Sequence, residues 1–336
     1  KKLKEAEQSL RKAIEINPDL AEAYSNLGIL LKDLGKLKEA EISTRKAIEI
    51  NPDLADSYSN LGGILIDLGK LKEAEIAYRK AIKINPNLTR VYYTLSKLKK
   101  SNNVKEYKNQ IFSKHILNNK IEIDQVNIYF ARANILHQEK NYRESTKYLH
   151  LANKFKISIK RSNSEILINK SQVLLLESGK ELIQEQETEN TPESIFIVGM
   201  PRSGSTLVES ILSINPYVND LGEINILEES FIQRKKSEKE LSLAVLYWNN
   251  VTNHKSDLKI TTNKWLYNYQ YAGIIANNIR NSKLIHCYRN PLDNILSMYR
   301  TYFASGNEYS SSLVDCAKVY INHEQLMNHY KNRFQS

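Results

Sequence analysis

A glycine-framed stretch near the middle of the chain combines hydroxyl and guanidinium side chains. It runs from Gly199 to Thr206 as GMPRSGST and fits the phosphate-loop pattern G-x-x-x-x-G-K-[ST], except that Ser205 stands where the pattern has lysine. The backbone N–H groups of such a loop, followed by a helix N-terminus, bind anions. Lysine at this position neutralises the β and γ phosphates of a nucleoside triphosphate. Its replacement by serine favours a ligand whose transferred group carries less charge.

A phosphosulfate meets this condition, because its terminal sulfuryl group bears only a single negative charge. The side chains of Arg202, Ser203, Ser205 and Thr206, together with the loop N–H groups, could balance that charge without a metal ion. On the loop alone, two alternatives stay open: a degenerate nucleotide loop, and a tight turn with no ligand.

A second group of polar residues lies within one segment, KLIHCYRNPLDNILSMYR, residues 283–300. It reads as a buried strand that ends at Arg289, a turn, and a helix that presents Ser297. With both segments, the chain resembles the sulfotransferases that use 3′-phosphoadenosine 5′-phosphosulfate (PAPS), in particular the tyrosylprotein-type and bacterial tetratricopeptide-linked group. Their first signature, P-R-S-G-T-T, matches Pro201 to Thr206 with a conservative change at Ser205.

The resemblance implies where the donor binds and which side chains act on it. The implied donor-binding residues are Pro201, Arg202, Ser203, Gly204, Ser205, Thr206, Arg289 and Ser297, with the last two on the 3′-phosphate.

The implied catalytic residues are Glu223 in DLGEIN as general base, Lys264 in TTNKW at the leaving-group oxygen, and Arg202 as a further source of positive charge. No metal is implied. The alternatives are that Glu223 only begins a helix, and that His254 is the base, as a histidine is in cytosolic sulfotransferases.

The elements that must hold these residues can also be predicted. The apolar run at 194–200 indicates a strand buried on both faces, and an apolar-periodic helix follows the loop. The resemblance therefore implies an α/β, P-loop-like sulfotransferase domain with a parallel sheet over residues 194–336. Such domains usually run on for about another hundred residues past Ser336, so we expect the C-terminal part to be missing. Lys1 lies within an amphipathic pattern, which suggests a missing N-terminus as well.

The first part of the chain repeats itself. Asn-Pro pairs recur at residues 17, 51 and 85, a spacing of 34 residues, and small residues match in register at Gly28 and Gly62. This is the period of tetratricopeptide repeats, which are helix pairs stacked as a solenoid. The segment 125–156 reads as a diverged helical hairpin with a turn near 139–141. We expect an all-α solenoid over residues 1–158 and a helical, polar linker over 159–193.

Equivalent positions in the repeats carry Asn26 and Asn60, on the helices that line the concave groove. Their side-chain amides could bind the backbone of an extended peptide, as the asparagine ladders of similar arrays do. The third repeat has Thr94 there, so two exposed residues copied by duplication are an equal alternative. The repeats otherwise predict a protein or peptide partner.

Composition limits the remaining classes. The formal net charge is +10, but the lysines are scattered, which argues against nucleic acid. The two cysteines, Cys287 and Cys316, make no disulfide framework or metal cluster. The apolar runs are far shorter than the roughly 20 residues that span a membrane. These features favour a cytoplasmic protein.

The sequence thus predicts a two-domain sulfotransferase that transfers a sulfuryl group from PAPS to a hydroxyl, possible acceptors being protein tyrosine, a glycan or a metabolite. One rival is a tetratricopeptide scaffold with a degenerate, non-catalytic nucleotide-binding domain. A nucleotide kinase is a second rival, which Ser205 disfavours.

Overall fold

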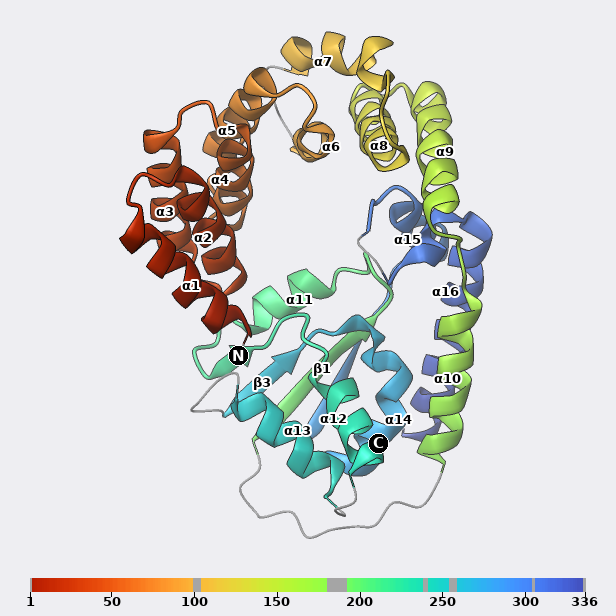
Figure 1. Ribbon diagram of the computed structural model, residues 1–336. Helices are drawn as coiled ribbons and strands as arrows, with labels where there is room; N and C mark the ends of the chain where they lie inside the picture. Colours follow the sequence, from red (N-terminus) through yellow and green to blue (C-terminus); the bar gives the residue numbers. More distant parts are fainter. Residues whose placement is uncertain are drawn as a thin grey trace. The chain divides into compact units, whose positions relative to one another are not determined.

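A computed structural model of the chain describes residues 2–98, 104–179, 192–237, 241–253, 259–303 and 306–334 (Figure 1). The chain divides into two compact units, Lys1–Ile159 and Lys160–Ser336. The first is all-helical and the second contains a parallel sheet, as the sequence predicts.

The first unit is a series of helices joined by short turns. They are α1 (Lys2–Ile16), α2 (Ala21–Asp33), α3 (Leu37–Ile50), α4 (Ala55–Asp67), α5 (Leu71–Ile84), α6 (Thr89–Lys97), α7 (Val104–Phe112), η1 (His115–Leu117), α8 (Glu122–Gln138) and α9 (Tyr142–Ile159). The Asn-Pro pairs at 17, 51 and 85 lie between successive helices, because proline cannot continue the hydrogen-bond ladder of a helix.

Small residues allow the paired helices of the repeats to approach closely. A Cβ atom on Gly28 would lie 2.0 Å from Thr44 Oγ1, and one on Gly62 would lie 2.7 Å from the ring of Tyr78. Four alanines at repeat-related positions are fully buried: Ala40, Ala47, Ala74 and Ala81. The predicted hairpin at 125–156 is confirmed by α8 and α9, which pack against each other around the turn at 139–141.

The second unit is built on four parallel strands in the order β2-β3-β1-β4. Its elements are α10 (Glu165–Ser178), β1 (Glu193–Gly199), α11 (Ser205–Leu212), β2 (Val218–Asp220), α12 (Ile226–Lys236), α13 (Leu243–Thr252), β3 (Ile260–Asn263), η2 (Leu266–Tyr271), α14 (Ala272–Asn278), β4 (Ser282–Cys287), α15 (Pro291–Tyr299), η3 (Glu308–Ser311) and α16 (Leu313–Arg333).

Alternating residues of the central strand β1 serve two separate cores. Phe196 and Val198 belong to the larger core, which also takes apolar residues from α12, α13, α14 and α16. Ile195 and Ile197 face the other way, where α11 contributes Val208 and Leu212. The strand is therefore buried on both faces, as its continuous apolar run predicts.

The helical part of the predicted linker belongs to the second unit. Helix α10 lies alongside α16 (Figure 1) and places Leu174 in the larger core. The Gln270 side chain donates hydrogen bonds to Leu167 O and Ser171 Oγ, both at 2.9 Å. Residues 180–191 of the predicted linker lie outside the described residues.

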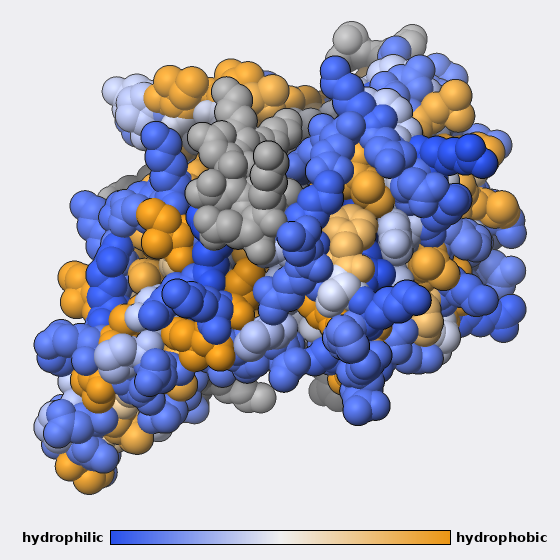
Figure 2. All heavy atoms as spheres, turned by 90° about the horizontal axis from the view of Figure 1, so that it is seen from above, coloured by the Kyte–Doolittle hydropathy of each residue, from blue (hydrophilic) through white to orange (hydrophobic). Residues whose placement is uncertain are grey.

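Hydrophilic residues cover most of the face in Figure 2, with apolar residues distributed among them. A search of the described helices found none with the length and apolar character needed to cross a membrane. Both cysteines are buried free thiols, as expected for Cys287 in an apolar strand.

Candidate active site

The glycine-framed loop joins β1 to α11 in a conformation that its sequence makes possible. Gly199 has φ 151°, and a Cβ atom there would lie 2.5 Å from Cys287 O in the neighbouring strand. Arg202 adopts the left-handed region with φ 71°, which is uncommon for a residue with a side chain and often marks a ligand site. Gly204, at φ 105°, is the N-cap residue of α11, whose first N–H groups have no acceptor within the helix.

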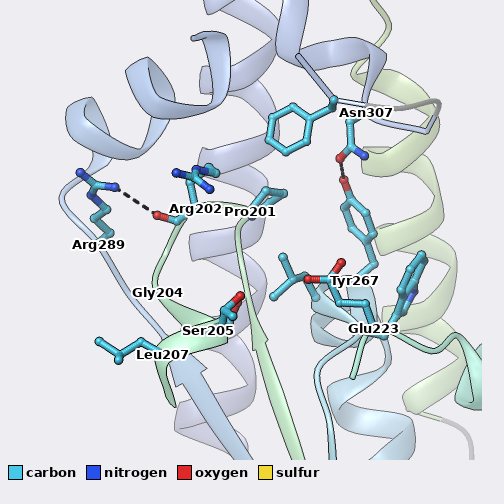
Figure 3. A pocket seen from close by; sticks show the side chains of 13 residues that line it. Pro201, Arg202, Gly204, Ser205, Leu207, Glu223, Tyr267, Arg289 and Asn307 are labelled. Carbon is cyan, nitrogen blue, oxygen red and sulfur yellow. Dashed lines mark hydrogen bonds between the residues drawn. The ribbon is translucent and has the colours of Figure 1, made fainter. Parts of the chain in front are cut away.

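Arginine side chains gather at this loop. Arg289 follows β4, and its Nη1 donates a 3.2 Å hydrogen bond to Arg202 O (Figure 3). Arg202 Nε in turn donates to Ser297 Oγ on α15 at 3.4 Å. The two predicted signatures therefore meet, and they bring two guanidinium groups and a hydroxyl together. Tyr320 of α16 supports the arrangement by donating to Arg289 O at 2.8 Å.

A pocket of about 490 Å³ opens beside the loop. Figure 3 shows Arg202 and Arg289 on one side of it and Glu223 and Tyr267 on the other. Tyr267 donates a hydrogen bond to Asn307, and burial raises its pKa to about 12, so its hydroxyl keeps its proton at neutral pH. One end of the pocket is thus cationic, and a carboxylate stands at the other.

A buried lysine lies next to that carboxylate. Lys264 Nζ is 2.7 Å from Glu223 Oε1, 3.3 Å from Thr206 Oγ1 and 3.8 Å from Glu209 Oε2. The Lys264 side chain is only 7% exposed, whereas that of Glu223 is 58% exposed and faces the pocket. Lys264 is not among the described residues that line the pocket, but it reaches the loop at Thr206, whereas Glu223 is open to a molecule in the pocket.

Glu209 is a site residue that the sequence argument missed. It lies on α11, with its side chain 10% exposed, and accepts a 3.1 Å hydrogen bond from Thr262 Oγ1. Burial raises its pKa, although the nearby Lys264 charge acts in the opposite direction. The sequence does carry a signal for Glu209. It lies one helical turn after Ser205, on the helix face whose apolar residues Val208 and Leu212 pack toward the sheet, so an acidic residue there is unexpected.

The strand order explains why these side chains converge. Glu223 follows β2, Lys264 follows β3, the loop follows β1 and Arg289 follows β4, so all four features lie at the carboxyl edge of the parallel sheet. Backbone pairing continues just past the strands, because Lys264 N donates to Gly222 O at 2.9 Å. Ligands of open α/β sheets bind at this edge.

Most of the predicted donor residues line the pocket. They are Pro201, Arg202, Gly204, Ser205, Thr206 and Arg289. Among the described residues, Ser203 and Ser297 lie beside the pocket and are not part of its lining. Ser203 holds the loop, since its N–H donates to Met200 O at 3.2 Å. His254, the alternative base, lies outside the described residues.

The two predicted groove asparagines differ in their surroundings. Asn26 is exposed on α2. Asn60 is half-buried on α4, and its Nδ2 donates a 3.0 Å hydrogen bond to Ser25 Oγ of the preceding repeat. One amide of the pair is therefore engaged in contacts between repeats.

Family comparisons agree with both units. Residues 21–54 and 55–88 match the tetratricopeptide repeat, and residues 1–35 match a further repeat profile. Residues 192–243 and 233–336 match the sulfotransferase family. An uncharacterised protein of Aquifex aeolicus (strain VF5) is 29% identical over 163 residues, which is 42% of this chain and 21% of that protein. The chain thus spans about a fifth of the length of that relative.

Solved structures with some similarity include MamA, at 20% identity and a TM-score of 0.36, covering 45% of this chain and 87% of MamA. The tetratricopeptide protein YrrB is 18% identical with a TM-score of 0.33, covering 51% of this chain and 85% of YrrB. The family matches carry the assignment: this chain combines tetratricopeptide repeats in its first unit with a domain of the sulfotransferase family in its second.

Proposed function

We propose that the second unit transfers a sulfuryl group from PAPS to a hydroxyl acceptor. The observation that carries this proposal is the order of groups along the carboxyl edge of the sheet: the Glu223 carboxylate, the Lys264 ammonium, the anion-binding loop and the Arg289 guanidinium. This order runs from a group that can accept a proton to groups that can hold phosphates. The match to the sulfotransferase family supports a sulfotransferase-like activity.

The residues around the loop fit a donor with two phosphate-containing ends. The first N–H groups of α11 and the side chains of Ser205 and Thr206 can bind the 5′-phosphosulfate. Arg289 and Ser297 each form a hydrogen bond with Arg202 of the loop, which supports the proposal that together they bind the 3′-phosphate. The donor supplies an activated sulfuryl group when it is bound.

The reaction we propose is an in-line displacement at sulfur. The acceptor oxygen forms a bond to sulfur as the bond from sulfur to the bridging oxygen breaks, and adenosine 3′,5′-bisphosphate leaves. Glu223 takes the acceptor proton, an effect worth about 10² to 10⁴ in rate. Lys264 lies beside Thr206 of the loop, where its charge stabilises the negative charge that develops on the leaving group.

Binding measurements test the donor and separate the rivals. A sulfotransferase of this kind binds adenosine 3′,5′-bisphosphate without magnesium, a kinase prefers ATP with magnesium, and a pure scaffold binds neither. Arg289→Ala should weaken binding of the bisphosphate by a free energy on the order of 2 to 5 kcal/mol, which is typical for losing one partner of a charge pair. Adenosine 5′-phosphate, which lacks the 3′ group, should lose little. Equal losses for both ligands would contradict the assignment.

The role of Glu223 requires a separate test. Glu223→Gln keeps the shape of the side chain but cannot accept a proton, so turnover should fall by about two to four orders of magnitude at nearly unchanged bisphosphate affinity. Glu229→Gln is the matched control, because Glu229 is exposed on α12, in the same β2–β3 connection as Glu223. Unchanged turnover in Glu223→Gln would remove it from this role and return attention to His254.

We further propose that the repeats bind a protein partner. If the acceptor hydroxyl is a tyrosine of a peptide, this partner is the acceptor itself. Because Asn60 already contacts Ser25, Asn26→Ala is the cleaner test, and loss of its hydrogen bond should cost about 0.5 to 1.5 kcal/mol. The Michaelis constant should rise for a protein acceptor and stay constant for a small phenol. If the Michaelis constant of Asn26→Ala equals that of the wild type for both acceptors, the repeats serve assembly and do not bind the acceptor.

A further inference from the structure

A second group of ionisable side chains lies behind the donor-binding edge, between β4 and α16. His286 comes from the strand, and His323 and Glu324 come from the helix. One nitrogen of each histidine and one carboxylate oxygen all lie within 4.8 Å of one another. His323 is 1% exposed, and the other two residues are half-buried. Residues far apart in the sequence thus bring three potential ligands to one point.

Four buried polar atoms of this cluster make no hydrogen bond with the described residues. His286 Nε2, both ring nitrogens of His323 and Glu324 Oε1 are buried and make no hydrogen bond within the described part of the chain. His323 Nδ1 lies 3.1 Å from Glu324 Oε1, a contact that lacks hydrogen-bond geometry. Buried polar groups in native proteins are nearly always satisfied by protein, by water or by an ion. Several such atoms in one place therefore call for a common partner.

We propose that His286, His323 and Glu324 bind one divalent transition-metal ion, for which zinc is the best candidate. Two imidazole nitrogens and a carboxylate oxygen are a ligand set that zinc accepts, with water completing a tetrahedral shell. Imidazole ligands select against magnesium and calcium, which prefer oxygen. The partial exposure of Glu324 leaves a path for the ion and for the water.

The side chains are close to, but not at, the spacing that zinc requires. Ligand atoms about 2.0 to 2.1 Å from a tetrahedral ion are roughly 3.4 Å apart, so a separation of up to 4.8 Å has to close by up to about 1.4 Å. Rotation of the Glu324 and His286 side chains can supply this.

The ion would join two elements that position the donor site. Tyr320, one turn before His323 on α16, donates to the carbonyl of Arg289, and Arg289 follows three residues after His286. A metal link between strand and helix would therefore brace the contact that holds the Arg289 backbone. This role is structural and does not depend on the identity of the donor or acceptor.

Zinc uptake by the whole chain tests the site. Protein purified without a histidine tag is stripped with a chelator, loaded with zinc chloride and passed over a desalting column, and bound metal is measured by mass spectrometry. We expect one zinc per chain. Excess zinc at about a hundred times its dissociation constant should raise the Tm of the second unit by roughly 5 to 10 °C.

Substitutions at the cluster and away from it give the controls. His323→Ala and Glu324→Gln should each weaken zinc binding by at least about 10- to 100-fold, the cost of losing even an outer-shell partner of a metal. Glu324→Gln is the milder change, and its fold can be checked by circular dichroism if His323→Ala does not fold. His329→Ala, on the exposed side of the same helix, should bind zinc as the parent does. Uptake below one equivalent, or uptake that is the same in the cluster variants and the parent, would overturn the proposal and leave a buried water as the common partner.

Discussion

Replacement of Lys264 by methionine should destabilise the second unit in a way that depends on pH. Methionine keeps most of the length of the side chain and removes the charge, which leaves the buried Glu209 carboxylate without its counter-charge 3.8 Å away. Two unit charges at this distance attract by about 4 kcal/mol at an effective dielectric constant near 20, and by about 1 kcal/mol in water. The pair of Lys264 with Glu223 adds less, because the Glu223 side chain is 58% exposed.

The sign of the pH dependence follows from the direction of the Glu209 pKa shift. Burial raises this pKa above its unfolded value, so ionisation of Glu209 costs stability as the pH rises through the folded pKa. Loss of Lys264 raises the pKa further, and each unit of that rise adds about 1.4 kcal/mol to the cost at high pH. We therefore expect Lys264→Met to lose about 2 to 4 kcal/mol at pH 8, and the loss should become smaller as the pH falls toward the raised pKa of Glu209.

Tryptophan fluorescence can follow this unit alone, since Trp248 and Trp265 are the only tryptophans of the chain and both lie in the second unit. Urea unfolding from pH 5 to pH 8 then gives the stability of that unit, although the chain as a whole need not unfold in one step. Lys283→Met is the matched control, because this side chain is 67% exposed in its pair with Glu193. A loss in Lys264→Met that is as small and as flat with pH as the control would refute the reasoning.

Two further predictions concern close contacts of glycines. Gly62→Ala should lower the Tm of the repeats in circular dichroism, at a cost of about 1 to 3 kcal/mol, because its Cβ would lie 2.7 Å from the Tyr78 ring. Gly63→Ala, with the nearest atom at 3.6 Å, should instead gain up to about 1 kcal/mol of helix stability, and a loss as large as that of Gly62→Ala would contradict the packing. Gly199→Ala should destabilise the second unit by about 3 kcal/mol or more, because its Cβ would lie 2.5 Å from Cys287 O at a left-handed φ. Wild-type urea stability in that variant would contradict the close approach of β1 and β4.

The sequence predicted the features that depend on local pattern. The 34-residue period fixed the helix pairs, and the apolar run before the glycine-framed loop fixed a buried strand. It did not predict features that depend on which distant faces meet. Glu209 reads as an ordinary polar residue of a helix until the sheet buries it beside Lys264. Likewise His286 and His323 are 37 positions apart, and only the packing of α16 on β4 brings them together.

Helix α10 affects how this protein can be divided, both in the laboratory and in evolution. The sulfotransferase-family match begins at residue 192, but the folded unit begins at Lys160. A truncation at the start of the family match would remove Leu174 from the core and leave the buried Gln270 amide without its two acceptors on α10. A fragment that keeps the second unit intact therefore starts near residue 160. Any fusion of this sulfotransferase-family domain to another protein has to include α10 to keep these contacts.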